Sequence, residues 1–145
     1  MKELPMTPLY TAKATADKGR KGRAVSDDGR LDVGLSTPKA LGGDDGPGTN
    51  PEQLFAAGYA ACFMSAMQLV SGQTGIKLPV EARVHAEVGI GPREAGGFGL
   101  AVTLTAELPG LAEQDARTLV NETEKVCPYS NATRGNVSTV LNVAG

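Results

Sequence analysis

The chain has 145 residues, 41% of them hydrophobic, which is enough for one core and predicts a single domain over residues 1–145. Its 14 basic and 16 acidic residues give a formal charge of −2 without a long run of one sign, which argues against nucleic acid or an anionic membrane surface as a partner. Aromatic residues make up only 4% and tryptophan is absent, which removes the stacking platforms of single-strand nucleic-acid binders.

The first ten residues, MKELPMTPLY, contain no apolar run like that of a signal peptide, so we expect a cytoplasmic protein. Two cysteines are too few for a disulfide framework, and together with the single histidine, His85, they offer no convincing metal cage. We therefore expect no bound metal or cofactor, while redox chemistry at the cysteines stays open.

The N-terminal third is predicted to form a small antiparallel sheet. Residues 9–16 (LYTAKATA) alternate apolar and polar side chains, and the strand signal resumes at residues 24–26 after a glycine-containing turn, with Arg20 and Arg23 in or beside it. Residues 30–36 alternate again, which gives a three-strand meander. Residues 41–48 (LGGDDGPG) are too rich in glycine for regular structure and are predicted to be a loop.

A central helix is predicted to follow this loop. Asn50 can cap it, Pro51 suits the first helical position, and Gln53 completes a capping box. No charged residue occurs between Gln53 and Lys77, so the helix has no solvent-facing stripe and should be covered on nearly every side. The apolar run over residues 54–70 is shorter than the roughly 20 residues of a membrane span, so we expect no membrane insertion.

The second half of the chain is predicted to contain three strands and one amphipathic helix. Residues 80–90 alternate with one buried face, which places His85 on the outward face, and residues 98–108 form the returning strand. Residues 111–127 carry an apolar stripe opposite charged residues, as in an amphipathic helix. Residues 137–143 are predicted to be a final edge strand.

The two thiols occupy different local settings. Cys62 follows the small residues of 56–61 inside the central helix, and Cys127 lies at the end of the second helix because Pro128 disfavours helix at the residue before it. Either cysteine can be a plain core residue, since free cysteine is among the most buried residue types. An apolar site raises the pKa of a thiol, so Cys62 would require a nearby cation to react as a thiolate.

Two segments carry a resemblance to a known family. Residues 48–63, GTNPEQLFAAGYAACF, and residues 126–136, VCPYSNATRGN, resemble the two signature segments of the organic hydroperoxide resistance proteins within the OsmC-like superfamily. LYTA at residues 9–12 and LGG at residues 41–43 fall in order around them, so the resemblance covers nearly the whole chain.

The resemblance implies an α+β fold of the OsmC-like type, with antiparallel sheets packed around a central buried helix in an intertwined homodimer. It also implies a thiol peroxidase that reduces alkyl or fatty-acid hydroperoxides to alcohols. Such an enzyme binds no cofactor and is recycled by dihydrolipoamide or a lipoylated protein rather than by thioredoxin or glutathione.

The resemblance also assigns roles to four residues. It implies that Cys62 is oxidised to a sulfenic acid and that Cys127 resolves it as a disulfide. Arg20 would hold the thiolate, and Glu52 would hold Arg20. Considered alone, Arg20 could be a solvated turn residue and Glu52 a first-turn acid that the helix dipole favours.

Other residues around the signatures have less specific expectations. Three apolar residues near Cys62 are core by default and would select an alkyl tail if they lined a pocket: Phe55, Phe63 and Met64. Five residues of the second signature are expected to fix the loop that carries Cys127: Tyr129, Ser130, Asn131, Arg134 and Asn136. The chain departs from the family pattern where a histidine is expected ahead of VC, because Glu124 and Lys125 stand there.

Two other functions are compatible with the cysteines. The first is a non-enzymatic redox sensor or binding module, in which a disulfide between Cys62 and Cys127 changes the affinity for a partner. The second is a cysteine hydrolase with His85 as its base, although the alternating strand argues against it by turning His85 outward.

Overall fold

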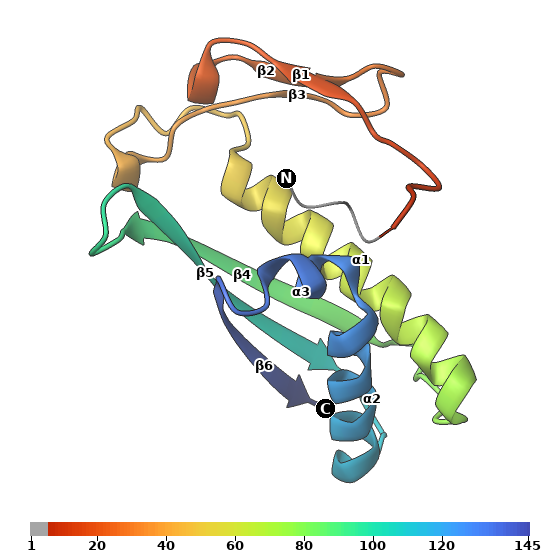
Figure 1. Ribbon diagram of the computed structural model, residues 1–145. Coiled ribbons are helices and arrows are strands. Elements are labelled where there is room, and N and C mark those ends of the chain that lie inside the picture. The colour runs from red at the N-terminus through yellow and green to blue at the C-terminus, as the bar shows by residue number, and fades with distance from the viewer. Residues whose placement is uncertain (1–5) are drawn as a thin grey trace. The chain divides into compact units, whose positions relative to one another are not determined.

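The computed structural model describes residues 6–145 and divides into two compact units, Met1–Pro51 and Glu52–Gly145 (Figure 1). That the two units make one domain stays a prediction.

Three short antiparallel strands make up the sheet of the N-terminal unit: β1 (Ala14–Ala16), β2 (Arg23–Ser26) and β3 (Asp32–Gly34), in that order. The predicted meander is confirmed. β1 is shorter than the predicted strand over residues 9–16, because its ladder pairs only Ala14–Ala16 with β2. Two 3-10 turns complete the unit: η1 (Gly19–Lys21) and η2 (Lys39–Leu41). Residues 42–48 contain no helix or strand, as predicted.

The C-terminal unit holds a second sheet of three strands, in the order β4 (Arg83–Pro92), β5 (Phe98–Glu107) and β6 (Ser138–Ala144). β4 and β5 form an antiparallel hairpin, but β6 runs parallel to β5. The prediction of purely antiparallel sheets is therefore wrong. The helices between β5 and β6 carry the chain back to the start of the sheet, which is the kind of crossover that parallel pairing needs. The predicted edge position of the last strand is confirmed.

β4 begins later than the alternating pattern suggests. The turn that closes with the Ala82 N–H bonded to the Pro79 carbonyl stands in place of the first predicted residues, and Val80 is exposed. The ladder with β5 starts only at Arg83, opposite Glu107. Val80 fits the alternating pattern, but it stays outside the sheet because β5 has already ended at Glu107, opposite Arg83.

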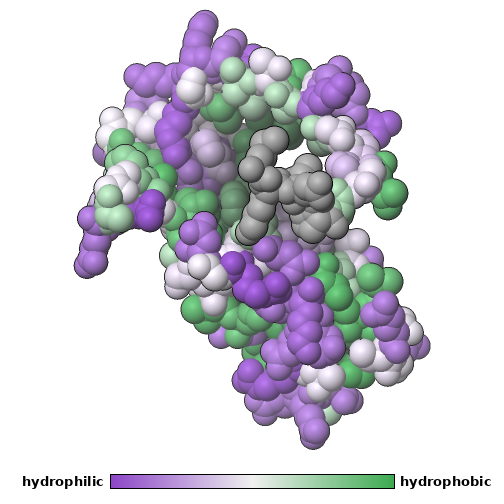
Figure 2. Space-filling view, viewed as in Figure 1, coloured by the Kyte–Doolittle hydropathy of each residue, from purple (hydrophilic) through white to green (hydrophobic). Residues whose placement is uncertain are grey.

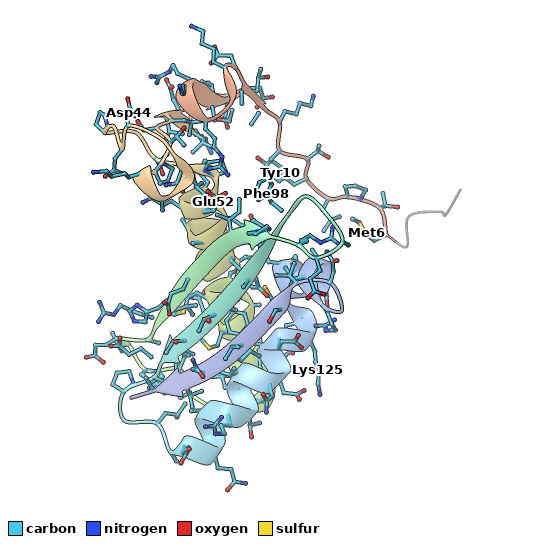
Figure 3. All side chains as sticks on the ribbon, turned by 90° about the vertical axis from the view of Figure 1, so that its left-hand side faces the viewer. Met6, Tyr10, Asp44, Glu52, Phe98 and Lys125 are labelled. Carbon is cyan, nitrogen blue, oxygen red and sulfur yellow. The ribbon has the colours of Figure 1, made fainter. Side chains whose placement is uncertain are left out.

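Three helices pack with this sheet: α1 (Pro51–Thr74), α2 (Glu113–Val126) and α3 (Pro128–Thr133). Tyr59, Phe63 and Met67 of α1 share one buried cluster with residues of β5 and α2 such as Leu104 and Leu119. Figure 3 looks onto the outer face of the sheet, with α1 behind it, and Figure 2 shows the hydrophilic outward surface of α2. The predicted central helix is thus the core helix of this unit.

One face of α1 stays at the surface, contrary to the expectation that nearly every side is covered. The exposed residues on this face are uncharged: Ala57, Ala61, Ser65, Gln68 and Leu69. Among the described residues, α1 is also the single helix long and apolar enough by composition to cross a membrane, so the expectation that it is too short is wrong. Its buried residues belong to the core of the unit, as those of a globular core helix do.

Candidate active site

The two cysteines meet inside the C-terminal unit. Cys62 lies midway along α1, Cys127 lies between α2 and α3, and both are free thiols. Their Sγ atoms are 3.9 Å apart, with the Cys127 thiol donating to Cys62. Cys127 is fully buried and Cys62 is half-buried, so the pair has one inner and one more accessible member.

Local chemistry explains the position of Cys127. α2 ends at Val126, and Cys127 itself is extended, with φ −66° and ψ 124°. Pro128 disfavours helical geometry at the residue before it and then fits the first position of α3. The predicted placement of Cys127 at the helix end is therefore confirmed.

The electrostatic setting of Cys62 opposes ionisation. Burial is the main cause that raises the pKa of the Cys62 thiol, and the neighbouring Cys127 raises it further. The backbone N–H of Tyr129 acts in the other direction, because a hydrogen bond to the sulfur favours the thiolate. The net pKa of Cys62 is raised, so a reactive thiolate here requires additional positive charge.

A buried hydroxyl group holds α3 against α1. Tyr59 Oη lies 2.8 Å from Ser130 Oγ and 3.2 Å from Thr133 Oγ1, and all three residues are buried. Tyr59 also belongs to an aromatic cluster with Phe55 and Tyr129, whose ring centroids lie 5.5 to 6.2 Å apart. These contacts fix α3, which begins directly after Cys127.

Gly58 makes room for this cluster. A Cβ atom at this position would clash with Tyr129 Oη at 2.6 Å and make a tight contact with its Cζ at 3.2 Å. The glycine in the middle of a helix is therefore explained by the ring that packs on it, despite the lower helix propensity of glycine.

A second set of contacts holds α3 to α2. Arg134 pairs with the Glu124 carboxylate, at 3.2 Å from Nε to Oε1 and 3.1 Å from Nη2 to Oε2, and we call this pair the Glu124–Arg134 bridge. Arg134 also donates to Asn131 Oδ1 at 2.7 Å. Four of the five residues predicted to fix the loop make side-chain contacts there: Ser130 with Tyr59 of α1, Arg134 with Glu124 of α2, Asn131 with Arg134, and Tyr129 with the aromatic cluster. A side-chain role for Asn136 stays a prediction.

Sequence reasoning missed two of these anchors, Tyr59 and Glu124. A usable signal existed for Tyr59, since a tyrosine on the buried side of a helix needs a partner for its hydroxyl. In the sequence, Glu124 stands out only as a departure from the family pattern. It is half-buried and accepts the guanidinium of Arg134, ten residues later in the chain.

The other predicted site residues are distributed over both units. Arg20 lies in η1 of the N-terminal unit, so its partnership with Cys62 stays a prediction. Glu52 is half-buried in the first turn of α1. Phe63 is fully buried in the core, and a pocket role for it stays a prediction, whereas Phe55 and Met64 are partly buried. A pocket role for these last two also stays a prediction.

His85 faces away from the thiols, as predicted. It lies on the outer face of the sheet with about half of its side chain exposed, and its Nε2 is 2.8 Å from Glu107 Oε1. Glu107 also pairs with Arg83 at 3.2 Å. His85 therefore lies on the side of the sheet opposite the helices that carry the two cysteines. This placement argues against the hydrolase hypothesis.

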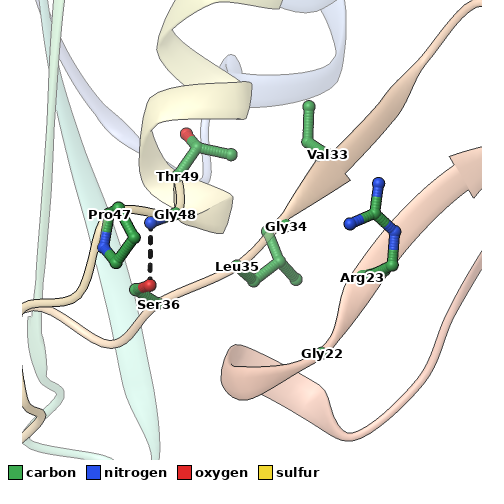
Figure 4. Close-up of a pocket in the computed structure, with 9 residues that line it drawn as sticks. All are labelled: Gly22, Arg23, Val33, Gly34, Leu35, Ser36, Pro47, Gly48 and Thr49. Carbon is green, nitrogen blue, oxygen red and sulfur yellow. Dashed lines mark hydrogen bonds between the residues drawn. The ribbon is translucent and has the colours of Figure 1, made fainter.

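The N-terminal unit contains a pocket of about 480 Å³ that lacks reactive groups (Figure 4). Arg23 lines it, but its guanidinium is paired with Asp32. Ser36 Oγ accepts the Gly48 N–H at 2.8 Å within the same pocket. Over residues 6–145, no group of three or more His, Cys, Asp or Glu side chains is arranged to hold a metal ion. The thiol pair is thus the candidate site.

Comparison with known proteins shows the family of the chain. Residues 42–142 match the family model described as OsmC-like protein. The organic hydroperoxide resistance protein of Xanthomonas axonopodis pv. citri is 56% identical over 140 residues, which cover 97% of this chain and 98% of that protein.

Solved structures show the same fold. An organic hydroperoxide resistance protein from Elizabethkingia anophelis has a TM-score of 0.90 at 50% identity, with 97% of this chain and 99% of that chain covered. OhrB of Bacillus subtilis, also an organic hydroperoxide resistance protein, has a TM-score of 0.85 at 44% identity, with 94% and 99% covered.

Proposed function

Because the chain belongs to the organic hydroperoxide resistance proteins of the OsmC-like family, we propose that it is a cysteine peroxidase that reduces alkyl or fatty-acid hydroperoxides to alcohols. The observation that carries the proposal is the 3.9 Å separation of the Cys62 and Cys127 sulfurs, with the more accessible thiol on Cys62. In a pair of this kind, one sulfur can be oxidised and the other can then form a disulfide with it.

The first step oxidises Cys62. Its thiolate attacks the terminal oxygen of the hydroperoxide, the O–O bond breaks, and the alkoxide takes a proton and leaves as the alcohol. Cys62 becomes a sulfenic acid. In this proposal Arg20 supplies the positive charge that the raised pKa of Cys62 demands, and Glu52 orients Arg20.

The second step closes the disulfide. Cys127 sulfur attacks Cys62 Sγ, the S–O bond breaks, and the oxygen leaves as water with two protons. An external dithiol then reduces the disulfide and is itself oxidised to a disulfide. We propose a dihydrolipoyl thiol, as dihydrolipoamide or on a lipoylated protein, for this role, and a cytoplasmic location for the protein.

We also propose that the protein is a homodimer. The open face of α1 is uncharged and rich in small side chains, with Ala57 and Ala61 at its centre. A second helix could approach this face closely, and apolar surface would be removed from water. The predicted intertwining of two chains belongs to the same proposal.

The test is a steady-state assay with tert-butyl hydroperoxide that compares dihydrolipoamide, thioredoxin and glutathione as donors. We expect many turnovers with dihydrolipoamide, few with the other two, and none in Cys62→Ser. Consumption of a single equivalent of hydroperoxide per chain with every donor would instead favour a redox sensor.

A further inference from the structure

A joint of one residue connects α2 and α3, and that residue carries the inner thiol. α2 ends at Val126 and α3 begins at Pro128, so the backbone of Cys127 alone sets the direction of α3. Any loosening between the two helices therefore displaces the Cys127 sulfur. The contacts between α2 and α3 therefore control the distance of the Cys127 sulfur from Cys62.

Pro128 also removes a hydrogen bond from the end of α2. In a continuous helix, the Glu124 carbonyl would accept the N–H of residue 128, but proline has none. Arg134 Nη2 donates to this carbonyl instead, at 2.5 Å. The arginine thus caps the last turn of α2 from the far end of α3.

The same guanidinium also binds the carboxylate of the Glu124 side chain. The Glu124–Arg134 bridge is two-pronged, and Asn131 orients the guanidinium through Nη1. The side chains of Arg134 and Glu124 are 47% and 29% exposed, so the bridge is partly shielded from water. A planar fork of this type fixes geometry better than a point charge does. The bridge closes a short loop around Cys127.

We propose that the Glu124–Arg134 bridge is a positioning device for the disulfide step, which keeps Cys127 within range of oxidised Cys62. Formation of the bond shortens the sulfur separation from 3.9 Å to about 2.05 Å. Its rate depends on how often the thiol occupies an attack geometry. Glu124 and Arg134 touch no reacting atom, so they are positioning residues. The inference deepens the proposed function and rests on it for its biological role.

The disulfide step can be measured without a peroxide. One equivalent of methyl methanethiolsulfonate transfers a methylthio group to the Cys62 thiolate and releases methanesulfinate. Cys127 thiolate then attacks Cys62 Sγ, the bond to the methylthio sulfur breaks, and methanethiolate leaves. Rapid acid quenching and mass spectrometry measure the lifetime of the methylthio adduct on Cys62. In Cys127→Ser the adduct should persist, because the thiol that displaces the methylthio group is missing.

We expect Glu124→Gln and Arg134→Gln each to lengthen that lifetime about fivefold, in keeping with the loss of a partly shielded ion pair. The double variant should be no slower than Arg134→Gln alone, because Arg134→Gln already removes both the bridge and the bond to the Glu124 carbonyl, which Glu124→Gln leaves in place. Arg134→Lys should be intermediate, since lysine keeps the charge but loses the fork. The matched control is Glu113→Gln, which breaks the Glu113–Arg117 pair at the other end of α2.

Unchanged lifetimes in both bridge variants would overturn the proposal, and so would an equal slowing in Glu113→Gln, which would trace the effect to α2 as a whole. With tert-butyl hydroperoxide, the bridge variants should oxidise Cys62 at the wild-type rate but accumulate more Cys62 sulfinic acid. Failure of wild type to consume hydroperoxide would refute the proposed function, while the methylthio lifetimes would still decide on the bridge.

Discussion

The sulfur atoms of Cys62 and Cys127 lie 3.9 Å apart although 65 residues separate them in the chain. The two cysteines differ in their burial. Cys127 is fully buried in the core, and Cys62 keeps some exposure. In the proposed reaction, the hydroperoxide would therefore meet Cys62 first, and Cys127 lies close enough to form the disulfide.

Replacement of Cys127 should separate the two oxidation steps. Cys127→Ser should consume about one equivalent of hydroperoxide and then stall or over-oxidise at Cys62, because the described residues hold no other thiol to close the disulfide. Stopped-flow kinetics and mass spectrometry of the product distinguish a stalled reaction from over-oxidation of Cys62. Full turnover of this variant with a dithiol donor would show that Cys127 does not resolve the sulfenic acid.

Replacement of Arg20 should change the ionisation of Cys62. Burial raises the Cys62 pKa, and the proposed role of Arg20 is to offset that rise, so Arg20→Ala should raise the pKa further. Less thiolate is then present at neutral pH, and the rise of rate with pH moves to higher pH. Arg20→Lys should restore only part of the activity. The thiolate is titrated by its ultraviolet absorbance, and an unchanged pKa in Arg20→Ala would make Arg20 a turn residue only.

The sequence predicts the structure correctly where one local feature decides it. Pro128 forces the break at Cys127, and the proline and cap residues at the start of α1 mark its first turn. Prediction from sequence fails where the outcome depends on encounters between distant elements. The parallel pairing of β6 with β5 and the contact of Tyr59 with Ser130 are set by tertiary packing, which no periodicity encodes.

The candidate site shows the same division. Composition and spacing left both cysteines with a plain core explanation, and only the resemblance paired them. Glu124 demonstrates the limit of resemblance as well. It marked a departure from the family pattern, and its bonds to Arg134 became visible only once α2 and α3 were placed.

Loss of the Tyr59 hydroxyl should destabilise the protein by about 1–2 kcal/mol, because Ser130 is buried and would lose its 2.8 Å partner. Tyr129→Phe is the matched control in the same aromatic cluster. Tyr129 keeps 36% of its surface exposed, unlike the fully buried Tyr59, so the expected change is within about 0.5 kcal/mol. Urea unfolding of Tyr59→Phe and Tyr129→Phe measures both, and equal losses would contradict a special role for the buried hydroxyl.

The surface cluster around Glu107 should make a pH-dependent contribution to stability. The hydrogen bond from His85, followed by that from Arg83, lowers the pKa of Glu107 below its ordinary value of 4.5. A carboxyl whose folded pKa is lowered stabilises the protein above its unfolded pKa and loses this effect as pH falls through the folded value. Glu107→Gln should therefore lower the melting temperature at pH 7 but not in strong acid. An equal loss at both pH values would point to packing instead.

The last prediction concerns which chain of the proposed dimer supplies Glu52. Glu52 and Cys62 are ten residues apart on α1, so they lie roughly 15 Å apart along its axis and cannot share a site directly. If two α1 helices cross antiparallel about a two-fold axis near Ala57, Glu52 of one protomer is brought level with Cys62 of its partner. Ala57 and Ala61 lie on the open face of α1, where such a crossing would require small side chains.

Complementation tests this arrangement. Cys62→Ser and Glu52→Ala chains, each inactive alone, are unfolded, mixed and refolded, and the heterodimer is isolated and assayed with tert-butyl hydroperoxide. A shared site would recover one intact set of Cys62, Arg20 and Glu52 per heterodimer, and so about half of the wild-type activity if the two sites work independently. A site within one chain would recover none, because the only remaining Cys62 would belong to the chain that lacks Glu52. An inactive heterodimer, with its formation confirmed by native mass spectrometry, would therefore rule out a site built across the two chains.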